Sequence, residues 1–323
     1  MNERTARTFC AAMILFSALI RLLDCAGFAI EPAQLPAGEV RVWPVQVIRQ
    51  APVQKPEEES IPAPEFVFTQ ADADGIHVGG TCSYTVDKLA LLQSENTLNI
   101  SASEPEVLIV HTHSTEAYSK SEGYEYEQSD PYRTLDENFS VIRIGKEIET
   151  VLTDAGIAAI HDTALNDYPV YSGGYDRMLP KIEQYLRQYP SISVVLDVHR
   201  DAIENKDGTQ CAFTANVNGK DCAQVMLVVG TDEGGLEHPE WKKNLANALK
   251  LQAVLNREYP NLCRDLELRC ERFNAHVANG AMLAEFGAAG NTLDEAINGA
   301  NAFAHGLADF LISCGTNMSP ETS

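Results

Sequence analysis

The sequence predicts an α/β fold in which a mostly parallel sheet carries helices on both faces. Short, continuous apolar runs, such as 107–110 and 192–198, are typical of strands that are buried on both sides. Longer segments with apolar residues at helical spacing alternate with these runs along the chain. Strands that alternate with crossover helices form parallel sheets covered by helices on both faces.

The predicted elements can be placed in chain order. They are a strand at 107–110, a helix at 141–155, a strand at 157–160, a helix at 176–187, a strand at 192–198, a hairpin that turns at Asn218-Gly219 into a strand at 225–229, a helix at 241–258, a strand at 281–286 and an amphipathic helix at 293–311. Gly156 is a common stop signal for the first helix. Pro180 is expected to fit its helix only near the first turn, since proline lacks an N–H group.

Composition divides the 323 residues into a targeting segment, a linker and one folded domain. Arginines precede an apolar stretch near the start, which predicts a signal peptide or a signal anchor over 1–30. Residues 31–74 are rich in proline and contain three consecutive glutamates, which favours an extended linker. A single catalytic domain is predicted over 75–315, with a C-terminal tail over 316–323. We therefore expect an extracytoplasmic protein, anchored to the membrane by its N-terminal segment.

The formal net charge of −22 excludes some partners, because nucleic acid and anionic lipid headgroups would repel such a chain. Six cysteines lie beyond the targeting segment, at spacings that do not predict a cysteine-ligated zinc. Cys211 with Cys222 and Cys263 with Cys270 are candidate disulfide pairs, and buried free thiols are the alternative.

Three predicted strands end in groups that bind metal ions or move protons. His111 and His113 follow the first strand, His199 ends the central one, and Glu285 ends the last. Binding sites in such sheets form at the carboxyl ends of the strands. A single histidine there is more often structural, whereas two strand-end histidines with a strand-end carboxylate indicate a shared site.

The residue types fit the hydrolysis of an amide. Zinc held by two imidazoles and one carboxylate, with a fourth position open, lowers the pKa of bound water to about 7 and polarises a carbonyl group. A further carboxylate accepts the proton of that water and passes it to the leaving nitrogen. His113, His199, Glu285 and one more acid meet this demand, so we expect Zn²⁺ as the cofactor.

Five stretches carry a resemblance to a known family. They are VLIVHTHSTEAY at 107–118, HDTALNDYPVYSGGYDR at 161–177, VVLDVHRDA at 194–202, MLVVGTDEGGLEHPEWKKNLANA at 226–248 and AMLAEFGAAGNTLDEA at 281–296. With them the chain resembles the stage II sporulation protein P family, which is related to zinc N-acetylmuramoyl-L-alanine amidases. The resemblance implies a membrane-tethered peptidoglycan hydrolase that cuts the amide between N-acetylmuramic acid and L-alanine, and also peptide cross-links, during sporulation septum remodelling or engulfment. It also implies stage II sporulation proteins D and M as partners.

The resemblance further implies roles for single residues. These roles are zinc ligation by His113, Glu137 and His199 and general-base catalysis by Glu285. The chain lacks the glycine-rich loop that the wider amidase family has around its first histidine. His111 and Glu116 therefore remain alternatives to His113 and Glu137.

Residues near these positions are candidates for contact with substrate. Tyr171, Tyr175 and Arg177 belong to a loop with two glycines that suits a glycopeptide groove, unless they only pack within the domain. Arg200 and Asp201 either contact substrate or form a structural ion pair. Two other functions remain open: a zinc carboxypeptidase or amidohydrolase of small amides, and a catalytically silent scaffold that binds the wall.

Overall fold

The computed structural model describes residues 65–100 and 104–315. The predicted targeting segment at 1–30, the C-terminal tail at 316–323 and most of the linker lie outside these ranges. Within them, no helix has the length and apolar character needed to cross a membrane. The six cysteines that lie within them are all free thiols.

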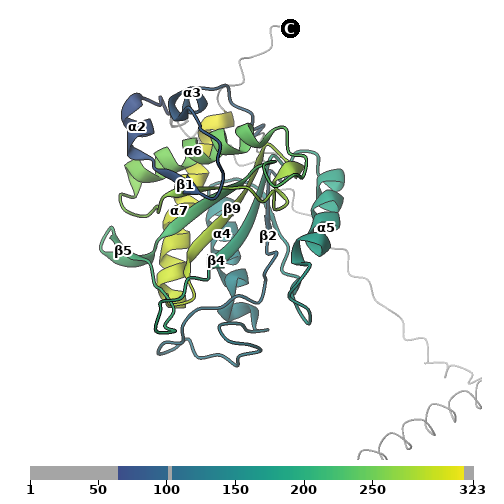
Figure 1. Cartoon of the computed structure of the whole chain (residues 1–323), viewed down its shortest axis with the longest axis vertical. Coiled ribbons are helices and arrows are strands. Elements are labelled where there is room, and N and C mark those ends of the chain that lie inside the picture. The colour runs from purple at the N-terminus through teal and green to yellow at the C-terminus, as the bar shows by residue number, and fades with distance from the viewer. Residues whose placement is uncertain (1–64, 101–103, 316–323) are drawn as a thin grey trace, which may run out of the picture. The chain divides into compact units, whose positions relative to one another are not determined.

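A seven-stranded sheet with the order β1-β8-β7-β9-β4-β2-β3 forms the centre of the domain (Figure 1). Its strands are β1 (Val78–Gly80), β2 (Val107–Val110), β3 (Ala159–His161), β4 (Val194–Asp201), β7 (Val225–Gly230), β8 (Leu266–Arg269) and β9 (Gly280–Ala288). Neighbouring strands are parallel except β7 and β9, which are antiparallel. The carboxyl ends of β2, β4 and β9 consequently lie at the same edge of the sheet.

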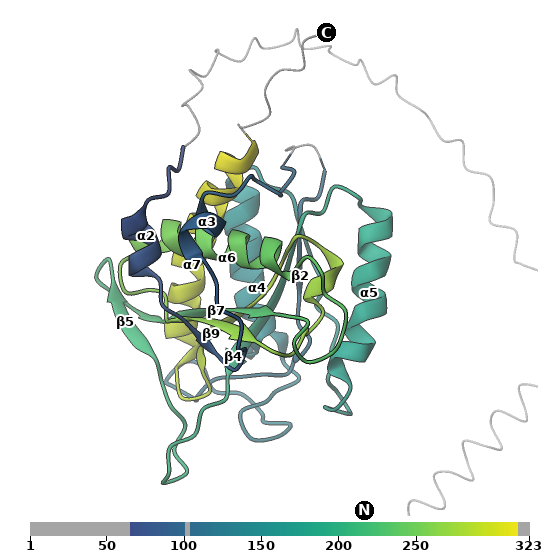
Figure 2. The ribbon, with the colours of Figure 1, turned by 45° about the horizontal axis from the view of Figure 1, so that its top comes forward.

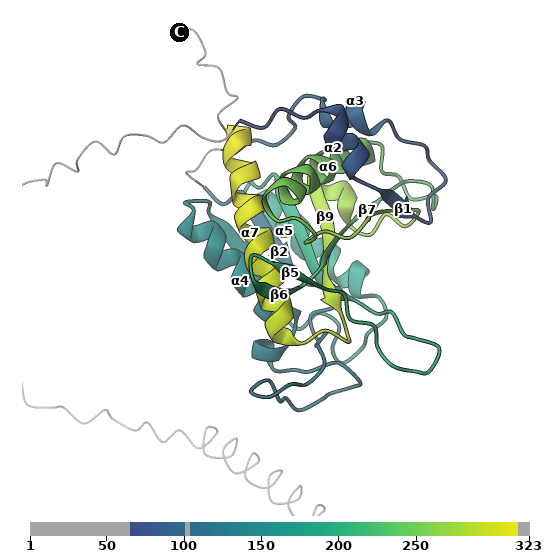
Figure 3. The ribbon, with the colours of Figure 1, turned by 90° about the vertical axis from the view of Figure 1, so that its left-hand side faces the viewer.

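Helices cover both faces of this sheet, as predicted. They are α2 (Gln70–Gly75), α3 (Lys88–Leu92), α4 (Val141–Asp154), α5 (Gly174–Gln188), α6 (Trp241–Glu258) and α7 (Leu293–Gly315), with the short 3-10 helices η1 (Glu137–Phe139) and η2 (Ala275–Val277). The larger core cluster packs α4, α6 and α7 on one face. On the other face, Met178 and Ile182 of α5 pack against Leu108 and Val195. Figure 2 shows α5 away from α6 and α7, and Figure 3 shows α7 beside α4.

Most predicted elements are confirmed, with shifts of a few residues. The helix predicted at 241–258 coincides with α6. The turn predicted at Asn218-Gly219 is confirmed, but it joins β5 (Thr214–Val217) to β6 (Lys220–Ala223) in a separate sheet, whereas the strand predicted at 225–229 is β7 of the main sheet. The expectation for Pro180 is wrong, because α5 starts at Gly174 and so holds Pro180 in its second turn. Because Pro180 has no N–H group, the carbonyl group of Asp176, four residues earlier, has no helical hydrogen bond. Both residues are exposed, so this carbonyl group can bond to water instead.

The packed domain begins before residue 75. Phe66 and Phe68 pack against the main core, and Ala73 of α2 is buried in it. Arg257 of α6 donates hydrogen bonds of 2.8 and 2.6 Å to the two carboxylate oxygens of Asp72. Residues 65–74, which the sequence assigned to the linker, therefore contribute to the fold.

We expect a chain that starts at Glu65 to melt at a higher temperature than one that starts at Gly75. The shorter chain loses the pair between Asp72 and Arg257 and the apolar contacts of Phe66 and Phe68. A loss of a few kcal/mol lowers the Tm of a domain of this size by about 2–4 °C for each kcal/mol. Thermal unfolding followed by circular dichroism measures the difference, and equal Tm values would show that these residues add no stability.

Candidate functional site

The candidate site lies at the shared carboxyl edge of β2, β4 and β9. The register of β4 and β9 pairs His199 with Glu285 on adjacent parallel strands. His113 lies in the turn that follows β2, and its ring centroid is 5.3 Å from that of His199, with the two rings nearly perpendicular. Residues that are far apart in the sequence thus meet at one end of the sheet.

Glu116 brings a buried carboxylate to this group. Glu116 is only 5% exposed, and its Oε2 lies 3.4 Å from Nδ1 of His199. The backbone N–H of Arg200 donates a hydrogen bond of 3.2 Å to the same oxygen. Burial raises the pKa of Glu116, but the charge of Arg200 and the contact with His199 outweigh it and lower the pKa to about 2. Glu116 is therefore an ionised ligand candidate at neutral pH.

Glu137 has different surroundings from the two histidines, which are buried or half-buried. It is the exposed first residue of η1, where the neighbouring Asp136 caps the turn by accepting a 3.0 Å hydrogen bond from the N–H of Asn138. Within the described part of the chain, no hydrogen bond or ion pair joins Glu137 to His113 or His199. The carboxylate that the structure brings to the histidines is the alternative, Glu116.

His111 is engaged elsewhere. Its Nδ1 lies 3.0 Å from the carbonyl oxygen of Val198, and its Nε2 lies 2.8 Å from Nε2 of His161. Burial, followed by the charge of His161, lowers the pKa of His111 to about 3, so its ring is neutral. Gly145 of α4 makes room for the pair, since a Cβ there would lie 2.5 Å from the ring of His161. Both ring nitrogens of His111 thus have partners, whereas the buried Nδ1 of His113 has no hydrogen-bond partner among the described residues.

Asp197 lies against His199 on the other side as an ion-pair partner, although no hydrogen bond of regular geometry satisfies Nε2 of His199 among the described residues. It lies two residues before His199, and one of its oxygens is 2.9 Å from Nε2 of that histidine. The N–H and hydroxyl groups of Thr112 donate hydrogen bonds of 2.8 and 2.6 Å to the same carboxylate. Burial opposes a charge on His199, but Asp197 and Glu116 raise its pKa well above the usual value. Sequence reasoning missed Asp197, although an acidic residue within an apolar strand and at i−2 from His199 was a usable signal.

Asp167 fixes the turn that carries His113. Its carboxylate accepts hydrogen bonds from Ser114 and from both the N–H and the hydroxyl group of Thr115, at 2.9 to 3.0 Å. Arg133 donates to it at 2.5 Å, and its Oδ2 lies 3.9 Å from Nδ1 of His113. Neither Asp167 nor Arg133 carried a signal in the sequence, because their importance depends on how the loops fold.

Glu285 differs from the other acids of the site. Its Oε2 is buried and has no hydrogen-bond partner among the described residues. Burial raises the pKa of Glu285 to about 8, although the charge of His199 acts in the opposite direction. A carboxyl group that changes protonation near neutral pH and lies beside His199 is suited to transfer protons.

Two tyrosines flank the histidines. The ring of Tyr171 stacks on His113 at a centroid distance of 4.4 Å, and the guanidinium carbon of Arg133 lies 4.5 Å from the same tyrosine ring. Tyr175 meets His113 edge to face at 5.7 Å and lies 6.5 Å from the ring of His199. Tyr171 is 53% exposed, so it forms the rim of the site and is available for contact with a ligand.

Arg177 holds the loop that carries Tyr171. It donates hydrogen bonds of 2.5 to 2.9 Å to three carbonyl oxygens of that loop, those of Asn166, Val170 and Ser172. These contacts support a structural role in place of the expected contact with substrate.

Arg200 and Asp201 are also used within the protein. Arg200 is 5% exposed, and its guanidinium group donates hydrogen bonds of 3.0 Å to the carbonyl oxygens of Ala117 and Tyr132. Asp201 accepts a hydrogen bond of 2.8 Å from Arg264. These contacts favour a structural role for both residues over contact with substrate. The ion pair of Asp201 is with Arg264, however, and not with Arg200 as expected.

The donor set matches zinc in kind. Among the described residues, no three His, Cys, Asp or Glu side chains already surround one point as a metal site does. Two imidazoles and a carboxylate are nevertheless the ligands that zinc prefers in hydrolases. His199 lies close to both of the other candidates, with its ring 5.3 Å from that of His113 and its Nδ1 3.4 Å from Glu116. Nδ1 of His113 is a buried nitrogen without a hydrogen-bond partner among the described residues.

Sequence comparison gives one family and one curated relative. The sequence model of stage II sporulation protein P (SpoIIP) matches residues 49–308. Stage II sporulation protein P of Bacillus subtilis (strain 168) is 28% identical over 213 residues, which cover 61% of this chain and 49% of that protein. The chain thus spans about half the length of this curated relative.

Several solved structures show a distant likeness. The N-acetylmuramoyl-L-alanine amidase from Clostridium difficile 630 has a TM-score of 0.37 at 13% identity, covering 67% of this chain and 100% of that chain. Ami1 from Mycobacterium smegmatis has a TM-score of 0.39 at 11% identity, covering 66% of this chain and 98% of that chain. At this level of likeness neither structure bears on the function of the chain.

We expect the Glu285→Gln variant to show a flatter pH dependence of stability than the unchanged protein when metal ions are chelated. Burial raises the pKa of Glu285 from 4.5 to about 8, so between these values the folded protein holds a proton that the unfolded chain has released. The free energy of unfolding therefore falls as the pH rises through this window, and glutamine removes that contribution. Urea unfolding of both proteins at several pH values between about 5 and 8 compares the slopes; identical slopes would contradict the raised pKa.

Proposed function

The chain belongs to the stage II sporulation protein P family, and from this premise we propose that it is a zinc-dependent hydrolase of bacterial peptidoglycan that acts in sporulation. The bond we assign to it is the amide between N-acetylmuramic acid and L-alanine, with peptide cross-links as a second target. One observation carries the proposal: two histidines and two acids lie together at one edge of the sheet, and the pKa of one acid is lowered while that of the other is raised. These residues are His113, His199, Glu116 and Glu285.

We assign zinc ligation to His113, Glu116 and His199. Bound zinc would polarise the carbonyl group of the amide and lower the pKa of a water molecule. Asp197 lies 2.9 Å from Nε2 of His199, so Nδ1 is the ring nitrogen on the side of Glu116, and we assign to Asp197 the role of holding the imidazole in this orientation. Hydrogen bonds from Ser114 and Thr115 to Asp167 hold the turn of His113 in the same way.

Glu285 is the proposed general base. It accepts a proton from the attacking water and returns it to the nitrogen of the leaving amine, as the hydrolysis of an amide requires. Its partly buried position beside His199, without a bonding partner for Oε2 in the described structure, leaves the carboxylate available for this transfer. Tyr171 and Tyr175 are the residues that we propose to contact substrate, because their rings flank the histidines.

The location and organisation of the protein are part of the same proposal. Residues 1–30 would target or anchor the chain, a proline-rich linker would follow, and the hydrolase domain would act outside the cytoplasm. Peptidoglycan is the substrate, and stage II sporulation proteins D and M are the partners that the family resemblance implies. Tethering suits an enzyme with an insoluble substrate, since it keeps the domain close to the wall.

We expect Glu116→Gln to remove most of the bound zinc and Glu137→Gln to leave it in place. Glutamine at position 116 lacks the charge that would bind the ion next to His199, whereas Glu137 is exposed on η1. Elemental analysis of both purified variants, after dialysis against zinc at a limiting concentration, measures metal per chain. Zinc loss in Glu137→Gln together with full zinc in Glu116→Gln would return the ligand role to Glu137.

We expect Glu285→Gln to keep its zinc and to lose turnover by a factor of about 10²–10⁴, the usual effect of removing a general base. Peptide release from purified sacculi, zinc content and Tm are measured on the same preparation. Near-normal hydrolysis by the folded, zinc-loaded variant would remove Glu285 from the mechanism.

The same assays on the unchanged protein test the two alternative functions. A protein that leaves sacculi intact but hydrolyses small soluble amides would be a small-amide hydrolase. A protein that binds sacculi but holds no zinc and has no activity would be a scaffold.

A further inference from the structure

Tyr175 lies between the two histidines of the candidate site. Its ring meets that of His113 edge to face at a centroid distance of 5.7 Å, and it lies nearly parallel to the ring of His199, at 15° and a distance of 6.5 Å. The hydroxyl group of Tyr175 has no hydrogen-bond partner among the described residues, and it is not one of the fully buried atoms that lack a partner. It is therefore an unused donor that a molecule entering the site can reach.

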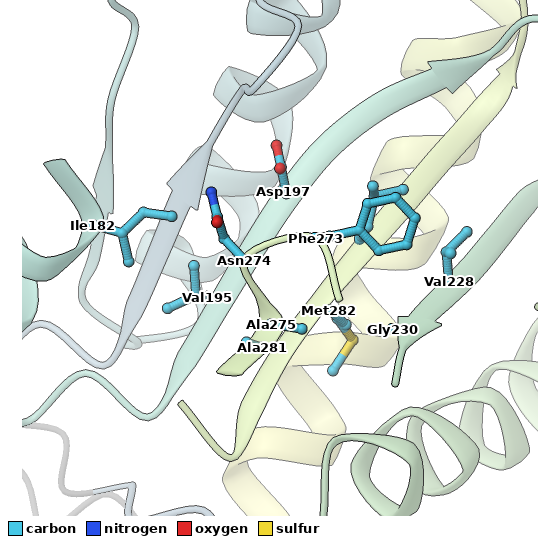
Figure 4. Close-up of a pocket in the computed structure, with 11 residues that line it drawn as sticks. Ile182, Val195, Asp197, Val228, Gly230, Phe273, Asn274, Ala275, Ala281 and Met282 are labelled. Carbon is cyan, nitrogen blue, oxygen red and sulfur yellow. The ribbon is translucent and has the colours of Figure 1, made fainter. Parts of the chain in front are cut away.

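Two contacts from the loop after β8 hold Tyr175 in this position. The ring of Phe273 packs against the ring of Tyr175 at a centroid distance of 5.5 Å. The side-chain amide of Asn274, a buried residue, donates a hydrogen bond of 2.9 Å to the carbonyl oxygen of Tyr175. Phe273, Asn274 and Asp197 line one small pocket (Figure 4). The loop that holds Tyr175 is thus next to β4, the strand that carries His199.

The start of α5 brings Tyr175 close to the turn that carries His113. Gly174, the first residue of α5, makes this approach possible, because a Cβ at this position would lie 3.0 Å from the carbonyl oxygen of Thr112 and 3.4 Å from Cε1 of His113. Asn166 ties the two segments together, since its side-chain amide donates hydrogen bonds of 3.0 Å to the carbonyl oxygens of both Thr112 and Gly174. The position of Tyr175 relative to His113 therefore follows from backbone contacts of the two segments.

Three acids of the site act on the hydroxyl group of Tyr175. A tyrosine keeps its proton at neutral pH even in water, where its pKa is about 10. Burial, followed by the negative charges of Asp197, Glu285 and Glu116, raises the pKa of Tyr175 further. The same charges disfavour any new negative charge that forms beside them. An oxygen atom that gains negative charge here consequently needs a hydrogen-bond donor.

The two arginines near the site are already engaged. Arg133 donates a hydrogen bond to Asp167, and its guanidinium group lies on the ring of Tyr171. Arg200 is buried and donates hydrogen bonds to backbone carbonyl oxygens. The hydroxyl groups of Tyr171 and Tyr175 remain without partners in the described part of the chain. Tyr171 lies at the exposed rim, whereas Tyr175 is half-buried between the histidines.

We infer that Tyr175 is a catalytic residue for the proposed hydrolysis, and that its hydroxyl group donates a hydrogen bond to the carbonyl oxygen of the amide that is cut. The inference rests on the proposed function, in which this oxygen gains negative charge as water adds to the carbonyl carbon. A donor that is fixed in advance at such an oxygen stabilises the transition state more than the substrate. The proton stays on Tyr175 throughout, while the proton of the water molecule passes through Glu285 to the leaving nitrogen. When the C–N bond breaks, the carbonyl group forms again.

The test compares Tyr175→Phe with Tyr185→Phe on soluble N-acetylmuramoyl-peptide fragments. Both variants remove one hydroxyl group from a tyrosine of α5, but Tyr185 bonds to Asp162 and lies about 15 Å further along the helix. We expect Tyr175→Phe to lower kcat by a factor of about 10²–10³, the usual effect of removing one donor to an oxyanion, with KM nearly unchanged. Zinc per chain and Tm should stay the same, because this hydroxyl group bonds to nothing in the described structure. Tyr185→Phe should keep the kcat of the unchanged protein.

A second measurement does not depend on turnover. A phosphinate analogue of the substrate, in which a negatively charged tetrahedral phosphorus group replaces the carbonyl group, resembles the transition state. Calorimetry should show that Tyr175→Phe binds this analogue about 10²–10³-fold more weakly than the unchanged protein does. Binding of the intact peptide is measured with Glu285→Gln, which does not cleave it. Addition of Tyr175→Phe to this variant should change the affinity for the peptide little.

Four results would overturn the inference. They are an unchanged kcat in Tyr175→Phe, a raised KM with unchanged kcat, a loss of zinc from this variant, and equal affinity of both proteins for the analogue. The second result would make Tyr175 a binding residue only, and the third would make it a metal ligand. Each of them is compatible with hydrolysis by the unchanged protein, so the proposed function would stand. Absence of hydrolysis by the unchanged, zinc-loaded protein would instead refute the proposed function, and the inference with it.

Discussion

The register between β4 and β9 is the constraint on which the site depends. It puts the Cα of His199 beside that of Glu285 on parallel strands, which lie about 4.8 Å apart. A slip of one residue would turn one of the two side chains to the opposite face and into the core. The buried residues that alternate with them, Val198 and Ala284, belong to the main core and fix this register through packing. The stability of the core and the geometry of the site are therefore set by the same two strands.

The charges around the site separate the roles of its acids. Buried carboxylates are stable as ions only where cations or hydrogen-bond donors meet them. Glu116 has Arg200 and His199 near it, whereas Oε2 of Glu285 has no hydrogen-bond partner among the described residues. The two pKa values consequently move in opposite directions, one to about 2 and the other to about 8. This separation supports the two roles that we propose, an ionised metal ligand for Glu116 and a proton-transfer group for Glu285.

Local patterns in the sequence were sufficient for much of the fold. The apolar runs and helical spacing predicted the central strands and the helices α4, α5, α6 and α7, because the burial of these elements is recorded in their own residues. The short elements α2, β1 and β8 were missed, since they lack the continuous apolar run that identified the equally short β2 and β3, and α3 was also missed. The choice between Glu116 and Glu137 depended on the path of the loop after β2 and on Arg133 and Arg200, which contact it from elsewhere. No local pattern encodes such contacts.

The unequal covering of the sheet explains where a ligand can reach. On one face α4, α6 and α7 cover the central strands, and the buried side chains that meet them are apolar. On the other face the core clusters are small, and α5 packs mainly on β2 and β4. The row formed by Val195, Asp197 and His199 therefore changes along one strand from apolar to charged, on the less covered face. The polar end of this row is the part that meets His113, Glu116 and Glu285, so the candidate site lies where the strand ends and not over its apolar part.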